Sequence, residues 1–134
     1  AQSAGLDVCS GGIMGLGESI GDRIDMALSL RDLGIKSIPV NMLNPIPGTP
    51  MEKYESLAVE EMQRIIAVYR FILPDSFIRL AGGRGLMDDK GRACFQSGAN
   101  AAISGDMLTT AGITVEKDKR LLEELDYKIK PFNL

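Results

Sequence analysis

The sequence contains no histidine among its 134 residues. Ser-His-Asp and Cys-His catalysis, histidine-ligated zinc and a histidine pH switch are therefore excluded for this chain. Tryptophan is also absent, and three tyrosines and four phenylalanines are too few for a surface that stacks nucleic-acid bases. With 15 Lys and Arg against 18 Asp and Glu, the net charge of −3 offers no basic surface for nucleic acid or an anionic membrane.

Cysteine is scarce as well, because only Cys9 and Cys94 occur, in no CxxC pair and no disulfide framework. Isolated cysteines are typical of a reducing compartment, so we predict a cytoplasmic protein. No apolar run approaches the ~18 residues that a membrane span needs. A content of 45% apolar and 25% charged residues predicts one packed domain over residues 1–134. The chain opens with Ala1 rather than Met, and we expect it to be part of a longer polypeptide.

Four short apolar segments alternate with four helical patterns. Predicted strands cover residues 6–10, 37–42, 77–80 and 100–104, and predicted helices begin near residues 19 and 57, cover about 91–97, and run through 115–129. Ser19 and Asp22 resemble a capping box at the start of the first helix, and Gly34 is placed where a left-handed cap would end it. Pro74 is predicted to end the second helix. Four strand–loop–helix units predict parallel strands joined by right-handed crossovers. Both an open doubly wound sheet and half of a (βα)₈ barrel, whose full length is ~250 residues, fit this pattern.

The alternation of side chains along the strands favours the half-barrel. Ile38, Val40 and Met42 oppose Pro39 and Asn41, and the strands at 6–10 and 77–80 alternate in the same way. Central strands of an open sheet, covered on both faces, should be apolar on both sides. Here one face is aliphatic, and the other carries a polar or reactive side chain that we place near the carboxyl end of each strand, where barrel enzymes bind their substrates.

The glycine-rich residues 11–18 follow the first predicted strand, where glycines make a tight turn or allow a ligand close to the backbone. A nicotinamide site is disfavoured, since the second strand ends without an acidic residue. Cys9 is either a small buried apolar residue or a ligand or nucleophile, whereas Cys94 is expected in the core.

Three polar features of the later segments also have two interpretations each. Arg79 lies in the middle of a strand and needs an anionic partner, either Asp7 or a bound anion. Asn41 either bonds neighbouring backbone or contacts a ligand. The pair at residues 109–110, Thr109 and Thr110, either leads into a helix or holds a carboxylate.

Several motifs together resemble the biotin synthases of the radical S-adenosylmethionine superfamily. The motif Gly11-x-Ile13-x-Gly15-x-x-Glu18 by itself indicates only the superfamily. The cysteine before it, the Arg79 segment and the Thr109-Thr110 loop narrow the resemblance, which covers nearly the whole chain. The matching stretches are VCSGGIMGLGE (residues 8–18), NML (41–43), GTP (48–50), IRLAGGR (78–84), GAN (98–100) and LTT (108–110).

The resemblance implies the C-terminal half of a (βα)₈ barrel and conversion of dethiobiotin to biotin by radical-mediated insertion of sulfur. It implies that Cys9 is one of three cysteine ligands of a [2Fe-2S] cluster and that Arg79 is its fourth ligand. Ile13 would pack on the adenine of S-adenosylmethionine, within a cofactor-binding motif that includes Gly11 and Gly15. Asn41 would bind the ureido ring of dethiobiotin, and Thr109 with Thr110 its carboxylate.

The family's CxxxCxxC motif, which holds the radical-generating [4Fe-4S] cluster, is absent here, as are the other cluster cysteines. We therefore expect the missing ligands in an upstream half-barrel and no turnover by this chain alone, while the parent would also need a reductant protein. Two alternatives are a stand-alone, non-catalytic binding or accessory module and part of a sister radical enzyme, either a hydrogenase-cofactor maturase or a methylornithine synthase. Because a half-barrel has two unpaired strand edges, we also expect a homodimer or other self-association.

Overall fold

The structure, a computed structural model, describes residues 1–106 and 112–130. Short strands alternate with helices along the chain, as the sequence pattern predicts. In order, the elements are the 3₁₀ helix η1 (Gln2–Ala4), β1 (Gly12–Met14), α1 (Ile20–Asp32), β2 (Ser37–Met42), α2 (Val59–Ile72), β3 (Phe77–Leu80), η2 (Arg84–Leu86), α3 (Arg92–Gln96), β4 (Ala101–Ala102) and α4 (Val115–Glu124).

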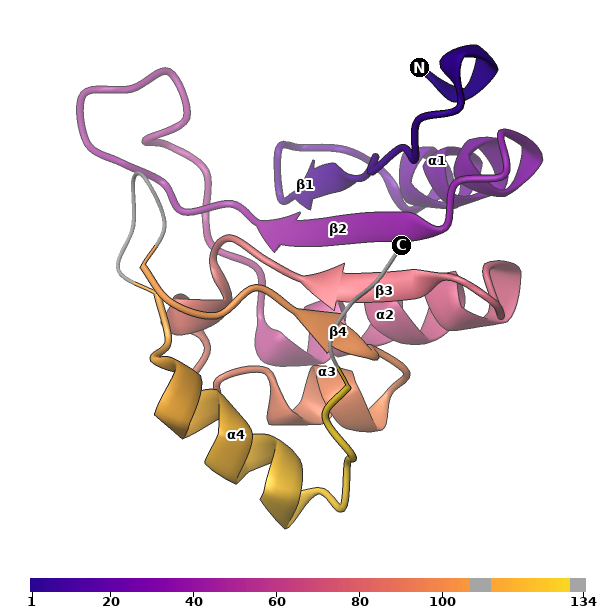
Figure 1. The fold of residues 1–134 in the computed structure, drawn as a ribbon. Coiled ribbons are helices and arrows are strands. Elements are labelled where there is room, and N and C mark those ends of the chain that lie inside the picture. The colour runs from indigo at the N-terminus through magenta and orange to yellow at the C-terminus, as the bar shows by residue number, and fades with distance from the viewer. Residues whose placement is uncertain (107–111, 131–134) are drawn as a thin grey trace.

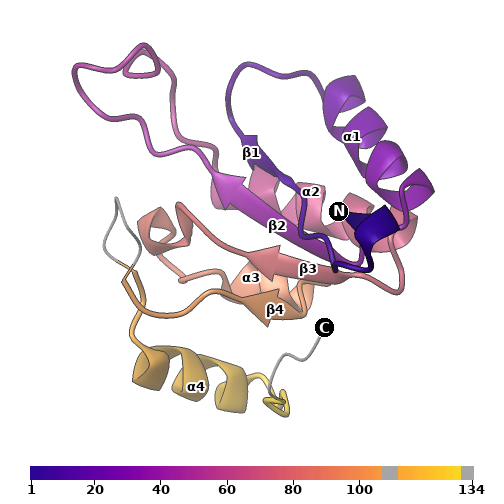
Figure 2. The ribbon, with the colours of Figure 1, turned by 45° about the horizontal axis from the view of Figure 1, so that its top comes forward.

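The four strands form one sheet in the order β1-β2-β3-β4, and every pairing is parallel. Gly12 pairs with Val40, Ser37 with Phe77, and Arg79 with Ala101. Helices α1, α2 and α3 lie on one side of this sheet, and α4 lies beyond β4 (Figure 1, Figure 2). This α/β arrangement confirms the predicted fold class and is consistent with half of a (βα)₈ barrel.

Local signals explain where the helices begin and end. The capping box is confirmed at α1, where the Asp22 N–H donates to the Ser19 hydroxyl and the Asp22 carboxylate accepts from the Ser19 N–H. Gly34, just after this helix, has a φ of 67°, the left-handed conformation expected for its position. Helix α2 ends at Ile72, two residues before Pro74.

The hydrophobic core lies between the sheet and the helices that cover it. Ile38, Val40, Ile78 and Leu80 are almost fully buried on the covered face of the two central strands. Burying one such side chain stabilises the fold by about 1.5–3 kcal/mol. The helices contribute Ala27, Leu30, Met62, Ile65, Ile66, Tyr69, Cys94 and Phe95 to the same core.

Three element boundaries differ from the prediction. The first strand covers residues 12–14 rather than 6–10, and Leu6 is 62% exposed. The segment before it touches the sheet through an isolated bridge between Cys9 and Ser37. Strand β4 is limited to Ala101–Ala102, and α4 ends at Glu124, two residues before Asp126, whose φ is 59°.

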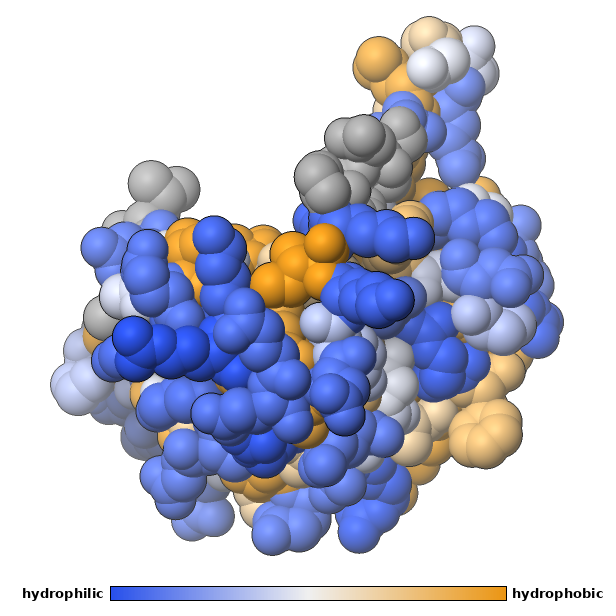
Figure 3. All heavy atoms as spheres, turned by 60° about the horizontal axis from the view of Figure 1, so that its bottom comes forward, coloured by the Kyte–Doolittle hydropathy of each residue, from blue (hydrophilic) through white to orange (hydrophobic). Residues whose placement is uncertain are grey.

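The outer surface around α3 and α4 is mostly hydrophilic, with smaller apolar areas between the charged side chains (Figure 3). Within residues 1–106 and 112–130, no helix has both the length and the apolar content that a bilayer crossing requires.

Candidate functional site

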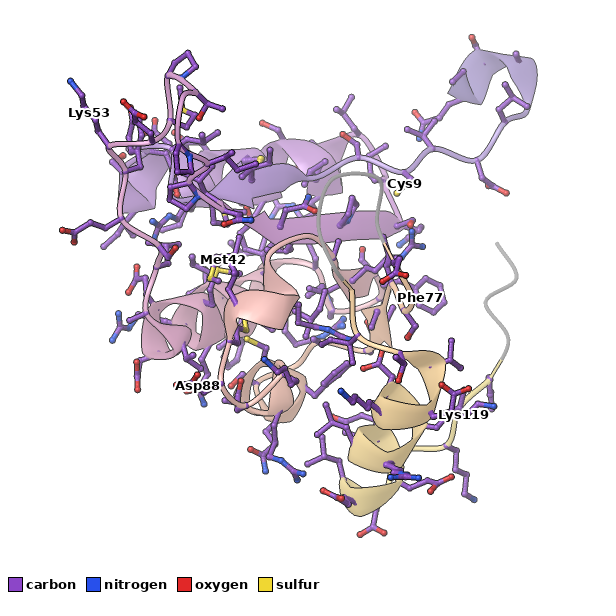
Figure 4. All side chains as sticks on the ribbon, turned by 90° about the vertical axis from the view of Figure 1, so that its left-hand side faces the viewer. Cys9, Met42, Lys53, Phe77, Asp88 and Lys119 are labelled. Atoms are coloured by element: carbon purple, nitrogen blue, oxygen red, sulfur yellow. The ribbon has the colours of Figure 1, made fainter. Side chains whose placement is uncertain are left out.

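The face of the sheet opposite the helices, here called the open face, carries the predicted site residues in layers. Paired residues of a parallel ladder point to the same side, so Cys9 lies level with Ser37, and Ile13 with Asn41. Arg79 lies level with Pro39, between these two layers. Figure 4 shows the contrast between the two faces, with Cys9 and Phe77 on one side and Met42 on the side of the helices.

Cys9, Ser37 and Arg79 form a connected cluster on the open face. The Ser37 hydroxyl lies 3.3 Å from Cys9 Sγ and donates to it, and Arg79 Nη2 donates to the same hydroxyl at 2.8 Å. Arg79 Nη1 lies 3.7 Å from Cys9 Sγ. The structure therefore brings the predicted thiol and guanidinium, 70 residues apart in the chain, into direct contact.

The position of Cys9 corrects the expectation that this reactive side chain lies near the carboxyl end of its strand. Cys9 precedes β1 by three residues and is level with Ser37, the first residue of β2. The thiol lies toward the amino end of the sheet because the strand that follows it is displaced to residues 12–14. Asn41 and Arg79, in contrast, are each the second-last residue of their strands, as expected.

Sequence reasoning missed Ser37, although its side chain joins the thiol to the guanidinium. Ser37 is completely buried and shares its strand face with Pro39 and Asn41. The alternation of side chains in β2 was therefore a sufficient signal for placing it on the open face.

Arg79 also borders open space. With Phe77 it lines a cavity of about 710 Å³ between β4 and α4, whose far wall includes Leu122 and Tyr127.

The glycine-rich turn has clear structural requirements of its own. A Cβ at Gly11 would lie 1.9 Å from the Pro39 carbonyl oxygen, so no other residue fits there. Gly15 is buried with a φ of 101°, and its N–H donates to Glu18 Oε1 at 2.8 Å. Ile13, the predicted adenine-binding residue, is 48% exposed on the open face and available for contact with a ligand.

A charged network holds this turn. Glu18 accepts from the N–H groups of Gly15 and Leu16, and Arg23 bonds both Glu18 at 2.8 Å and Glu61 at 2.6 Å. Partial burial by itself raises the pKa of Glu18, but these hydrogen bonds outweigh it and lower the pKa below its ordinary value. Glu18 is therefore ionised at neutral pH and fixes the turn in place.

Asn41 bonds the backbone on both sides. Its Nδ2 donates to the Gly12 carbonyl at 3.1 Å, and its Oδ1 accepts from the Gly82 N–H at 2.8 Å. The amide is thus held in one orientation, with one N–H of Nδ2 left for another acceptor. Its register partner Ile13 lies beside it on the open face.

The remaining predicted residues fall outside this arrangement. Thr109 and Thr110 lie outside the residues that the structure describes. Cys94, expected in the core, is fully buried in α3, and burial, with a smaller contribution from Asp89, raises the pKa of its thiol to about 11. Cys9 is therefore the only exposed thiol of the chain.

The open face offers one donor of the kind that iron–sulfur clusters use. Thiolates are the usual protein ligands of such clusters, and Cys9 could supply one. Among the described residues, however, no group of three or more Cys, His, Asp or Glu could hold a metal. A complete cluster site would need ligands from outside this part of the chain.

Comparison with known proteins decides the family. The model of the Biotin and Thiamin Synthesis associated domain matches residues 39–128. The chain belongs to this family and corresponds to the C-terminal part of biotin synthase. Over 130 residues it is 69% identical to a biotin synthase of Brachyspira hyodysenteriae and 60% identical to one of Akkermansia muciniphila.

Both alignments cover 97% of this chain but only 39% and 40% of the relatives. A biotin synthase of Clostridium botulinum is 55% identical over 129 residues, 96% of this chain and 41% of the relative. The chain thus spans about 40% of the length of the curated relatives that it matches.

Proposed function

We propose that this chain is part of a biotin synthase that converts dethiobiotin to biotin by radical-mediated insertion of sulfur. The observation that carries the proposal is the contact of Cys9 with Arg79 and Ser37 on the open face of a half-barrel sheet. Membership of the family and relatives named biotin synthase support this function over a hydrogenase-cofactor maturase, a methylornithine synthase or an accessory module.

In this proposal Cys9 is one thiolate ligand of a [2Fe-2S] cluster, and Arg79 is its fourth ligand. When bound, this cluster supplies the sulfur atom, and S-adenosylmethionine with a [4Fe-4S] cluster supplies the radical. The remaining cysteine ligands, including those of the [4Fe-4S] cluster, belong to the part of the enzyme that its relatives carry beyond this chain. The Ser37 hydroxyl orients both Cys9 Sγ and the Arg79 guanidinium toward the same space.

The substrates occupy the layers nearer the carboxyl ends of the strands. Ile13, in the motif with Gly11 and Gly15, contacts the adenine of S-adenosylmethionine. Asn41 uses its remaining N–H for the ureido group of dethiobiotin, and Thr109 with Thr110 binds the carboxylate. These groups bind and orient the substrate, while the chain on its own is inactive.

Paired cysteine variants of a full-length protein containing this chain test the proposal. We expect Cys9→Ala to lower the bound iron by the content of one cluster and to abolish biotin formation. Cys94→Ala is the matched control, and we expect it to keep the iron content and biotin formation because Cys94 lies in the core of α3, away from the open face. Iron analysis, visible absorption and biotin assay measure both. Full iron content and activity in Cys9→Ala would contradict the proposal.

The edges of the sheet imply a partner. Within the described residues, β1 and β4 each pair on one side only. Ile13 on the open face and Ile103 just after β4 are both exposed. We propose that the rest of the full-length protein closes the barrel here and that copies of the isolated chain associate instead. Sedimentation of the isolated chain at tens of micromolar, roughly the range of weak interfaces, should show dimers or larger species, and a pure monomer would contradict this.

A further inference from the structure

Arg23, in the first turn of α1, bonds two carboxylates that come from different segments of the chain. Its Nε donates to Glu18 in the glycine-rich turn at 2.8 Å, and its Nη1 donates to Glu61 of α2 at 2.6 Å. Only 11% of the Arg23 side chain is exposed, so solvent screens these pairs less than it screens pairs at the surface. The guanidinium therefore links the turn to α2.

Helix α2 also holds Arg23 at its backbone. The hydroxyl of Tyr69, further along α2 than Glu61, donates to the Arg23 carbonyl at 3.1 Å. Tyr69 is almost fully buried, and burial raises the pKa of its hydroxyl to about 12, so the hydroxyl stays protonated as a donor. The side chain and the carbonyl of Arg23 are thus both fixed to α2, whose inner residues belong to the core.

Glu18 connects this anchor to the backbone beside Ile13. Its carboxylate accepts from the N–H of Gly15 at 2.8 Å and from the N–H of Leu16 at 2.7 Å. Gly15 is confined from another side as well, because a Cβ there would lie 3.3 Å from Leu57 Cγ. Ile13 lies in β1, two residues before Gly15, so a shift of the turn moves the end of the strand that carries Ile13.

We propose that Arg23 is a positioning residue for S-adenosylmethionine, which acts through Glu18 to fix the turn that places Ile13 against the adenine. The inference rests on the proposed function, in which Ile13 contacts the adenine. Arg23 acts at a distance, since its guanidinium is directed to Glu61 of α2, a helix on the covered side of the sheet. Glu61 bonds Arg23 and Arg64, so its effect on the turn passes through Arg23.

Ligand binding to a full-length protein containing this chain tests the inference. The ligands are S-adenosylmethionine, 5′-deoxyadenosine, which shares its adenine, and methionine, which lacks it, each measured by calorimetry. Arg23→Met keeps an unbranched side chain but removes the charge and the donors. We expect it to weaken both adenine-containing ligands about tenfold and to change the affinity for methionine by less than about twofold.

Arg31→Met is the matched control. Arg31 lies in the last turn of the same helix and pairs with its exposed neighbour Asp32, away from the glycine-rich turn. We expect this variant to bind all three ligands as the unmodified protein does. A loss of adenine affinity equal to that of Arg23→Met would overturn the inference.

Two further variants show whether the effect passes through both carboxylates. Arg23→Lys keeps the charge, but an ammonium cannot reproduce the planar fork that bonds Glu18 and Glu61 together, so we expect the adenine-containing ligands to weaken by about threefold. Glu61→Gln should also weaken them by about threefold in the unmodified protein, with methionine unchanged. In the Arg23→Met background the same Glu61→Gln change should have no effect, because its route to the turn is already removed.

The outcomes separate the two proposals. Failure of the unmodified protein to bind S-adenosylmethionine overturns the proposed function. Unchanged adenine affinity in Arg23→Met, an equal loss for methionine, or a Glu61→Gln effect that persists in the Arg23→Met background overturns this inference alone. If Arg23→Met does not fold, Arg23→Lys and Glu61→Gln decide. Selective weakening of the adenine-containing ligands in both supports the inference, and unchanged affinity in either overturns it.

Discussion

The two faces of the sheet differ in what their side chains do. On the covered face, Ile38, Val40, Ile78 and Leu80 are buried against helices and make no polar contacts with their side chains. On the open face, Arg79 of β3 donates to the Ser37 hydroxyl of β2. Asn41 of β2 bonds the backbone of Gly12 in β1 and of Gly82 just after β3. The covered face therefore supplies stability, whereas the polar side chains of the open face are held in fixed positions by hydrogen bonds.

The largest expected effect comes from removing bulk on the covered side. Ile66 of α2 is completely buried, so Ile66→Ala should lower the free energy of unfolding by about 2–5 kcal/mol. The matched change on the open face, Ile13→Ala, should lower it by less than about 0.5 kcal/mol because Ile13 is half exposed. Urea denaturation measures the free energy of unfolding of both variants. Equal losses would contradict the proposed difference between the two faces.

The two cysteines, one exposed and one buried, should differ in how fast they react. With its pKa raised to about 11 by burial, only about one Cys94 thiol in a thousand is ionised at pH 8. Under reducing, iron-free conditions, iodoacetamide should modify the exposed Cys9 at least about a hundred times faster than Cys94. Mass spectrometry of digested protein follows each site. Denaturation in urea should bring the two rates together, and similar rates in the folded protein would contradict the prediction.

The smallest effect is expected at Glu18, in the glycine-rich turn that follows β1. Glu18→Gln removes the charge that accepts from Gly15 and Arg23 and should cost about 1 kcal/mol of stability at pH 7. Because the pKa of Glu18 is lowered in the folded protein, this contribution is fully present above the unfolded value of 4.5 and is lost as the pH falls through the folded value. Unfolding measured at pH 7 and pH 3 should show a smaller difference between the two proteins at pH 3.

The sequence predicts the central strands better than those at the edges. The bounds of β2 and β3 match the prediction, because alternation between an aliphatic and a polar face is clear in both. The predicted bounds of the first strand were wrong. Gly12 is a poor strand former, and residues 12–14 form the strand because Gly12 pairs with Val40 and Met14 is buried. These tertiary contacts leave no local pattern.

The same distinction applies to the site. Contact between Cys9 and Arg79 was predictable from their shared strand face, together with the resemblance that identified both as ligands. The bridging role of Ser37 and the two backbone contacts of Asn41 depend on distances across three strands, which one sequence without coordinates does not supply. The roles in cofactor and substrate binding stay predictions.

The order of the strands in the sheet repeats their order in the chain. During synthesis, each strand that leaves the ribosome therefore meets an edge made by the strand before it, and no segment must wait for a distant one. Shortening the chain from its C-terminal end would remove β4 and α4 without separating any earlier pair of strands. Assembly of this sheet can thus proceed stepwise, in the direction of translation.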